Sequence, residues 1–133
     1  MIIDSSAVVA VLARESDGDR YLRAIMDAGA SFISAASYVE VGVVLDRHQN
    51  RVAGRQLDPF LVEAAIELAP LTPEQARIAR AAYRDFGRGS GHPARLNFGD
   101  CFAYALAVGR NEPLLYKGDD FGHTDVRNAL EDS

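Results

Sequence analysis

Short apolar runs alternate with longer segments of helical periodicity along this chain, and that alternation restricts its fold more than any other feature. Three runs are short and apolar enough to be buried strands. The segments between them place apolar residues three or four positions apart, as a helix packed along one face does. This pattern predicts a three-layer α/β/α fold, in which helices cover both faces of a mainly parallel central sheet. The predicted strands are residues 1–4, 31–34 and 113–116.

Six segments are predicted to be helices on the same grounds. Thr72 followed by Pro73 is a typical helix start, and Asn97 is a typical cap. Pro70-Leu71 is expected to be a brief connector or strand, and residues 87–93 form a glycine-rich loop. The predicted helices are residues 7–13, 17–28, 35–50, 54–68, 73–86 and 100–109.

Two of these helices have a definite expected inner face. Val39, Val43 and Val44 are expected to point inward from the helix over 35–50, where burial must offset the low helix propensity of β-branched residues. The inner side of the helix over 54–68 is expected to carry Leu57, Leu61, Ala64, Ala65 and Leu68.

Length and composition limit the classes of protein. The chain has 133 residues, enough for a single domain over 1–133. Nineteen acidic against fourteen basic residues give a net charge of −5, which argues against a basic nucleic-acid coat protein and a polybasic membrane binder. Cys101 is the only cysteine, so a disulfide within the chain is excluded. The longest apolar run, Ala7 to Ala13, is too short to cross a membrane, and we expect a cytoplasmic protein.

Acidic residues stand at the ends or beginnings of four separate segments. Asp4 ends the first predicted strand, and Asp119 and Asp120 follow the last. Glu40 lies early in the helix that leaves the second strand, and Asp100 lies in the first turn of its helix. Because ligands bind beyond the carboxyl ends of parallel strands, we expect these carboxylates to meet at one edge of the sheet.

Each acid also has a purely structural explanation. Asp4 fits a helix cap, and the two acids after the last strand fit a turn. Glu40 and Asp100 each stand three residues after a capping residue, Ser37 and Asn97, as in a capping box. Taken together, carboxylates on apolar or small-residue helix faces favour a shared role, since a buried charge is costly unless it is paired. A divalent cation that polarises a phosphoryl group and activates water is an economical partner.

The acidic residues lie in four motifs that extend in order from one end of the chain to the other. They are IIDSSAVV at 2–9, SYVE at 37–40, LNFGDCFAY at 96–104 and LLYKGDDF at 114–121. This set resembles the motifs of the PIN-domain ribonucleases, and in particular those of the VapC-type toxins of bacterial toxin–antitoxin pairs.

The resemblance implies a metal-dependent endoribonuclease whose first three acids are Asp4, Glu40 and Asp100. Ser6 matches the small hydroxyl residue that supports the first acid. The resemblance further implies in-line attack by a water on Mg²⁺, or on Mn²⁺ as a substitute. Asp4 and Asp100 would be the primary ligands, while Glu40 and the fourth acid would hold a second ion or its waters.

The fourth acid is either Asp119 or Asp120. In many relatives an Asn or Asp comes soon after a threonine at the end of this strand, whereas residues 116–118 intervene here. We favour Asp119 for the metal site. Asp120 is the alternative, with a supporting role in fixing the loop.

The resemblance also implies partners: an RNA substrate, a cognate VapB-type antitoxin protein and a second copy of the chain in a homodimer. Arg88 and Arg95, in and beside the glycine-rich loop, are candidate contacts to RNA phosphates. Two other functions are compatible with the sequence. One is a catalytically silent PIN-like binding module, and the other is a different magnesium-dependent phosphoryl-transfer domain.

Overall fold

The computed structural model describes residues 1–47 and 51–131 and confirms the α/β fold class. The predicted helix over 35–50 is observed as far as Arg47, and its last three positions lie outside the described residues. In chain order the elements are β1 (Ile2–Ile3), α1 (Ser5–Leu12), α2 (Gly18–Ala28), β2 (Ser31–Ser34), α3 (Ala35–Arg47), α4 (Arg51–Glu63), β3 (Ile66–Ala69), α5 (Pro73–Phe86), α6 (Asp100–Arg110), β4 (Leu114–Leu115) and the short 3₁₀ helix η1 (Asp120–His123).

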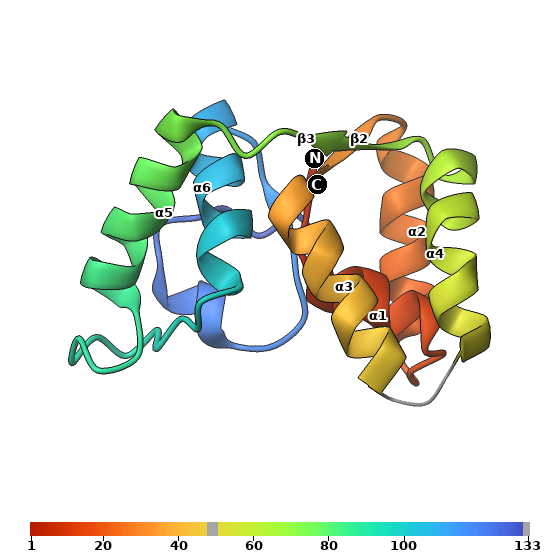
Figure 1. Cartoon of the computed structure of the whole chain (residues 1–133), viewed down its shortest axis with the longest axis horizontal. Helices are drawn as coiled ribbons and strands as arrows, with labels where there is room; N and C mark the ends of the chain where they lie inside the picture. The colour runs from red at the N-terminus through yellow and green to blue at the C-terminus, as the bar shows by residue number, and fades with distance from the viewer. Residues whose placement is uncertain (48–50, 132–133) are drawn as a thin grey trace.

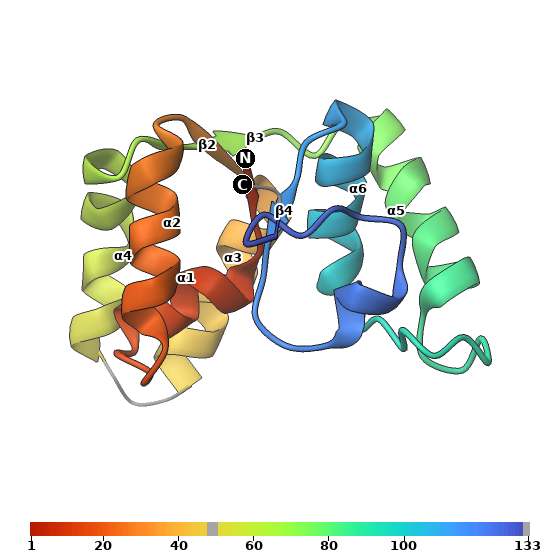
Figure 2. The ribbon, with the colours of Figure 1, turned by 180° about the vertical axis from the view of Figure 1, so that it is seen from behind.

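The strands form one parallel sheet in the order β3-β2-β1-β4. Ile2 of β1 pairs with Phe32 on one side and with Leu114 on the other. The segment after β4 returns to it, because Leu114 N–H donates to Arg127 O at 2.9 Å and Leu114 O accepts from Ala129 N at 2.9 Å. Figure 2 shows this returning segment in blue beside β4. Because these strands are parallel, the carboxyl ends of β1, β2 and β4 lie along one edge of the sheet.

Each face of the sheet is buried under its own group of helices (Figure 1), as the three-layer prediction requires. Successive strand residues point to opposite faces. Ile3 and Leu115 accordingly pack with residues of α1 to α4, whereas Ile2 and Leu114 pack with residues of α5 and α6. All four of these side chains are fully buried. The two adjacent strands are thus fixed in register from both sides.

The predicted helix over 54–68 is wrong at both its start and its end. Helix α4 runs over Arg51–Glu63, and the chain then turns at Ala65, whose φ of 55° lies in the left-handed region. Residues Ile66–Ala69 form β3, which pairs along its whole length with β2. Leu68 is 46% exposed instead of facing the core. The helical spacing of apolar residues continues past the end of α4, but the pairing with β2 makes these residues a strand. Pro70-Leu71, which follows β3, is a connector.

The predicted inner face of α3 is also wrong. Val39 and Val43 are 60% and 45% exposed, and Val44 is half-buried. The buried side instead carries Val41 and Leu45, one helical turn apart, because this is the side that faces the core beneath β2. The low helix propensity of Val39 and Val43 is therefore not offset by burial.

Within the described residues, no helix combines the length and the apolar character needed to span a bilayer.

Candidate active site

The acidic residues predicted from the sequence meet around one cavity of about 510 Å³ at the carboxyl edge of the sheet. They come from the end of β1, from α3, from the start of α6 and from the segment after β4. We call this space the acidic cavity. Its lining residues are Asp4, Ser5, Ser6, Val9, Glu15, Glu40, Val44, Asn97, Asp100, Lys117, Gly118, Asp119, Asp120 and Phe121.

Asp4 both caps a helix and presents an unpaired oxygen. Its Oδ2 accepts from the main-chain N–H of Ser6 at 3.0 Å and from the Ser6 hydroxyl at 2.5 Å, which caps α1. Its Oδ1 is buried and has no hydrogen-bond partner among the residues that the structure describes. Burial raises the pKa of Asp4 from 3.8 to about 7; the bonds from Ser6 oppose this rise, and the charges of Asp100 and Glu40 add to it. The helix cap alone therefore does not account for this side chain.

Asp100 also keeps its structural role. The main-chain N–H of Asn97 donates to Asp100 Oδ2 at 3.0 Å, and that of Asp100 donates to Asn97 Oδ1 at 2.9 Å, which forms the predicted capping box at the start of α6. Burial raises the pKa of Asp100 from 3.8 to about 6. The hydrogen bond from Asn97 and the charge of Arg88 oppose this rise, whereas Asp120 and Glu40 add to it. The capping box and a place in the acidic cavity are therefore compatible.

Glu40 does not form the capping box that its spacing suggested. Helix α3 begins at Ala35, and the Ser37 hydroxyl is buried without a hydrogen-bond partner in the described part of the chain. Glu40 instead accepts a hydrogen bond from the Ser5 hydroxyl at 2.5 Å. Its carboxylate lies against Gly99, where a Cβ atom would come within 2.5 Å of Glu40 Cδ. A side chain at Gly99 would thus occupy the place of this carboxylate.

The two acids after β4 are exposed and both line the acidic cavity. Asp120 begins η1, and the main-chain oxygen of Asp119 accepts from Gly122 N–H at 3.1 Å, so the predicted turn is present. The charge of Asp120 adds to the raised pKa of Asp100. The charge of Asp119 instead adds, after burial and Glu131, to the raised pKa of Tyr116. Asp119 stays a prediction for the fourth acid, and electrostatic proximity to Asp100 favours its neighbour Asp120.

The donor set suits a hard divalent cation. All the acidic side chains offer oxygen ligands, and the unpaired Oδ1 of Asp4 is a buried acceptor. Among residues 1–47 and 51–131, no three Asp, Glu, His or Cys side chains are arranged to hold one ion. Mg²⁺ commonly binds through one or two carboxylates and retains several waters. The arrangement therefore fits an ion that is held partly through water rather than by all the acids at once.

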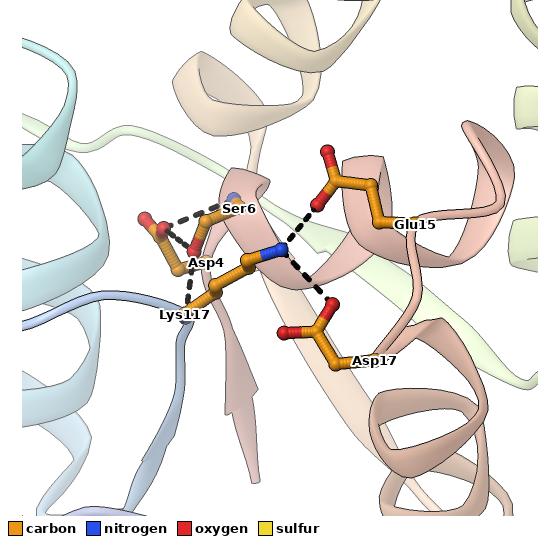
Figure 3. Close-up of polar contacts among 5 residues, drawn as sticks. All are labelled: Asp4, Ser6, Glu15, Asp17 and Lys117. Carbon is orange, nitrogen blue, oxygen red and sulfur yellow. Dashed lines mark hydrogen bonds and ion pairs between the residues drawn. The ribbon is translucent and has the colours of Figure 1, made fainter.

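Three residues of the site were not identified from the sequence. Ser5 bonds Glu40, Gly99 leaves room for it, and the main-chain N–H of Lys117 donates to Ser6 Oγ at 3.0 Å (Figure 3). All three residues lie within the four motif segments, and this position could have marked them as site residues. The two predicted RNA contacts, Arg88 and Arg95, are exposed and do not line the acidic cavity.

Comparison with known proteins identifies the family of this chain. The family model of the PIN domain matches residues 1–127. Ribonuclease VapC28 of Mycobacterium tuberculosis is 56% identical over 131 residues, which cover 98% of this chain and 98% of the relative. Ribonuclease VapC42 of the same species is 46% identical over 129 residues, covering 97% and 98%.

Two solved structures share the fold at 14% identity. The crystal structure of M. tuberculosis VapC20, a toxin that cleaves the sarcin–ricin loop, covers 94% of this chain and 95% of its own with a TM-score of 0.74. A toxin–antitoxin complex from Klebsiella pneumoniae covers 96% of both chains with a TM-score of 0.69. By its sequence and by the sheet that gathers its acids, the chain belongs to the PIN-domain family and, within it, to the VapC group.

Proposed function

We propose that this chain is a metal-dependent endoribonuclease, a single PIN domain over residues 1–133 that acts as the toxin of a toxin–antitoxin pair. The observation that carries the proposal is the convergence of acids from four separate segments on one cavity, with Asp4 Oδ1 buried and unpaired. The near full-length similarity to relatives named as VapC ribonucleases supports the same activity. The acidic cavity would receive the scissile phosphate together with its metal.

Asp4 and Asp100 are the proposed primary metal ligands. Glu40 and one of the two acids after β4 would hold a second ion or the waters of the first. A bound Mg²⁺ or Mn²⁺ would activate a water and offset the negative charge of the phosphate. The proposed roles need ionised carboxylates, which a cation favours over their protonated forms. Ser6 fixes the orientation of Asp4 through two hydrogen bonds.

The bond changes are those of hydrolysis by in-line displacement. The water oxygen forms a bond to phosphorus while the bond from phosphorus to the 3′-oxygen breaks. The leaving oxygen takes up a proton, so the products carry a 5′-phosphate and a 3′-hydroxyl. The hydrogen bond from the Ser5 hydroxyl holds Glu40 at the cavity wall, where its carboxylate can accept a hydrogen bond from the water.

The proposed partners are RNA, a VapB-type antitoxin and a second copy of the chain. One structural neighbour is a toxin–antitoxin complex, which supports pairing with an antitoxin. Exposed apolar side chains on α3 and α4 offer a surface for protein contacts away from the acidic cavity. They are Val39, Val43, Val52 and Val62.

The test is RNA cleavage by purified protein in the presence of Mg²⁺ or Mn²⁺. Asp4→Asn and Asp100→Asn keep the shape of each side chain and remove its charge. Because loss even of outer groups around a metal costs 10–100-fold, each variant is expected to lose about 100-fold or more. Asp27→Asn, at an exposed position of α2, is the matched control and should retain the wild-type rate. If Asp4→Asn cleaves RNA at the wild-type rate, the cleavage does not depend on the proposed site. That result would favour a catalytically silent binding module with cleavage from another source.

A further inference from the structure

Lys117, the only lysine of the chain, makes two ion pairs at the rim of the acidic cavity. Its Nζ lies 2.7 Å from Glu15 Oε1 and 2.9 Å from Asp17 Oδ1 (Figure 3). Both acids belong to the turn between α1 and α2, about a hundred residues earlier in the chain. We call these three side chains the Lys117 clamp. The clamp ties the segment after β4 to the turn after α1.

The main chain of the same lysine contacts the proposed metal site. Its N–H donates to Ser6 Oγ at 3.0 Å, and Ser6 Oγ donates to Asp4 Oδ2 at 2.5 Å. A hydroxyl has a single proton to donate. The main-chain N–H of Lys117 occupies an acceptor site of the Ser6 hydroxyl, and the hydroxyl proton is directed to Asp4 Oδ2. Among the described residues, Asp4 Oδ1 is then the oxygen without a hydrogen-bond partner.

The clamp also precedes the acids of the last motif. Gly118 follows directly with φ of +103°, a conformation that favours glycine, and the chain then passes through Asp119 and Asp120. A shift at Lys117 would therefore displace these two acids and the hydroxyl of Ser6 together. Lys117 is thus connected to two parts of the acidic cavity.

A direct contact from the lysine to an RNA phosphate is the competing explanation. The clamp contains one positive and two negative charges, a sum of −1, so it offers no net attraction for a phosphate. The hydrogen bonds that Lys117 donates to Glu15 and Asp17 raise its pKa, which keeps the lysine charged and bound to them. The three side chains are 36–37% exposed, so these pairs are screened by water and are expected to add little to overall stability. Their geometry is therefore better explained by local positioning.

We propose that Lys117 is a positioning residue, which the clamp holds in place so that its main chain orients Ser6 and Asp4 and sets the position of Asp119 and Asp120. This role rests on the proposed metal-dependent cleavage. In this role, the two ion pairs between Lys117 and the turn after α1 help to prepare the site for its metal.

The experiment compares Lys117→Met, Lys117→Arg, Glu15→Gln and Asp17→Asn with wild-type protein. Arg84→Gln is the control. It removes the exposed ion pair between Arg84 and Asp85 on α5, a helix that does not line the acidic cavity. Calorimetric titration of metal-free protein with Mn²⁺ gives metal affinity, RNA cleavage gives kcat and KM, and thermal unfolding gives stability.

Lys117→Met is expected to weaken Mn²⁺ binding and to lower kcat by about 10-fold each, the size typical of groups that orient metal ligands. KM should change less than twofold. Glu15→Gln and Asp17→Asn should act in the same direction, and Lys117→Arg should recover much of the loss. All variants should unfold within a few degrees of Arg84→Gln, which should match wild type in metal binding and cleavage.

A different pattern would overturn the proposal. If Lys117→Met raises KM alone while Glu15→Gln and Asp17→Asn increase cleavage, the lysine binds RNA directly and the clamp restrains it. Unchanged Mn²⁺ affinity and kcat in the variants, with active wild-type protein, would overturn the positioning role alone. Wild-type protein that neither binds Mn²⁺ nor cleaves RNA would overturn the proposed function and the positioning role together. If Lys117→Met does not fold, the Glu15 and Asp17 variants decide the matter by the same criteria.

Discussion

Gly99→Ala is the substitution that most specifically displaces a proposed catalytic carboxylate. Gly99 has φ of −65° and ψ of −36°, which alanine adopts without strain. The new Cβ would overlap Glu40 Oε2 and would lie 2.5 Å from Glu40 Cδ. Carbon atoms in contact lie about 3.5–4.0 Å apart, so the carboxylate must retreat by about 1 Å or more.

The cost of this retreat should fall mainly on activity. Moving Glu40 breaks its 2.5 Å hydrogen bond from Ser5. Such a bond to a charged group is worth about 1.5–3 kcal/mol, and replacing glycine returns about 0.4–1 kcal/mol through the unfolded chain. The free energy of unfolding should therefore fall by no more than about 2.5 kcal/mol. A displacement of about 1 Å in a catalytic group costs on the order of 100-fold in rate.

Single-turnover RNA cleavage and urea unfolding measure these two effects separately. Gly42→Ala is the matched control, because a Cβ at Gly42, on the same helix as Glu40, meets no atom within 4 Å. It should leave cleavage unchanged and stabilise the protein by about 0.5–1 kcal/mol, as alanine does in a helix interior. Wild-type cleavage by a folded Gly99→Ala protein would refute the role assigned to Glu40.

Three further predictions use the same assays. Ser5→Ala removes the hydrogen bond to Glu40 and should reduce RNA cleavage about 10-fold while the protein stays folded; an unchanged rate would contradict the positioning of Glu40 by this hydroxyl. The folded-state pKa values of Asp4 and Asp100 are raised from 3.8 to about 7 and about 6, so folded protein binds protons that the unfolded chain releases. In the presence of chelator, the free energy of unfolding should therefore fall as pH rises from about 4 to about 7, and Asp4 should contribute up to about 4 kcal/mol of this fall. A melting temperature that rises over this pH range would contradict the raised pKa values. Cys101 is buried and burial raises its pKa to about 11, so iodoacetamide at pH 7.5 should modify it only after unfolding, as mass spectrometry would show.

The sequence was sufficient to predict that the acids meet at one edge of the sheet, because they stand at fixed places relative to the strands. Asp4 and the acids after β4 follow apolar runs that pair as parallel strands, so the fold must bring them to one edge. Asp100 was identified together with its capping partner, and both of its roles are compatible in the structure. These inferences depended only on local pattern and on the geometry common to parallel sheets.

The incorrect predictions concern features that only tertiary contacts decide. Strand β3 follows a helix whose apolar spacing continues beyond Glu63, and its pairing with β2 depends on residues about 35 positions earlier in the chain. The inner face of α3 depends on which side meets the core, and valine spacing alone chose the wrong side. The hydrogen bond from Ser5 to Glu40 also joins residues far apart in the chain, so no local motif reveals it.

The proposed activity is RNA cleavage that requires a divalent metal held by the acidic cavity. The most direct test is the rate of RNA cleavage by the purified chain as Mg²⁺ or Mn²⁺ is added to metal-free protein, together with the chemical ends of the products. We predict no cleavage in chelator, a rate that rises to saturation with metal, and products that carry 5′-phosphate and 3′-hydroxyl ends. Cleavage that continues in chelator and leaves 2′,3′-cyclic phosphates would contradict this prediction.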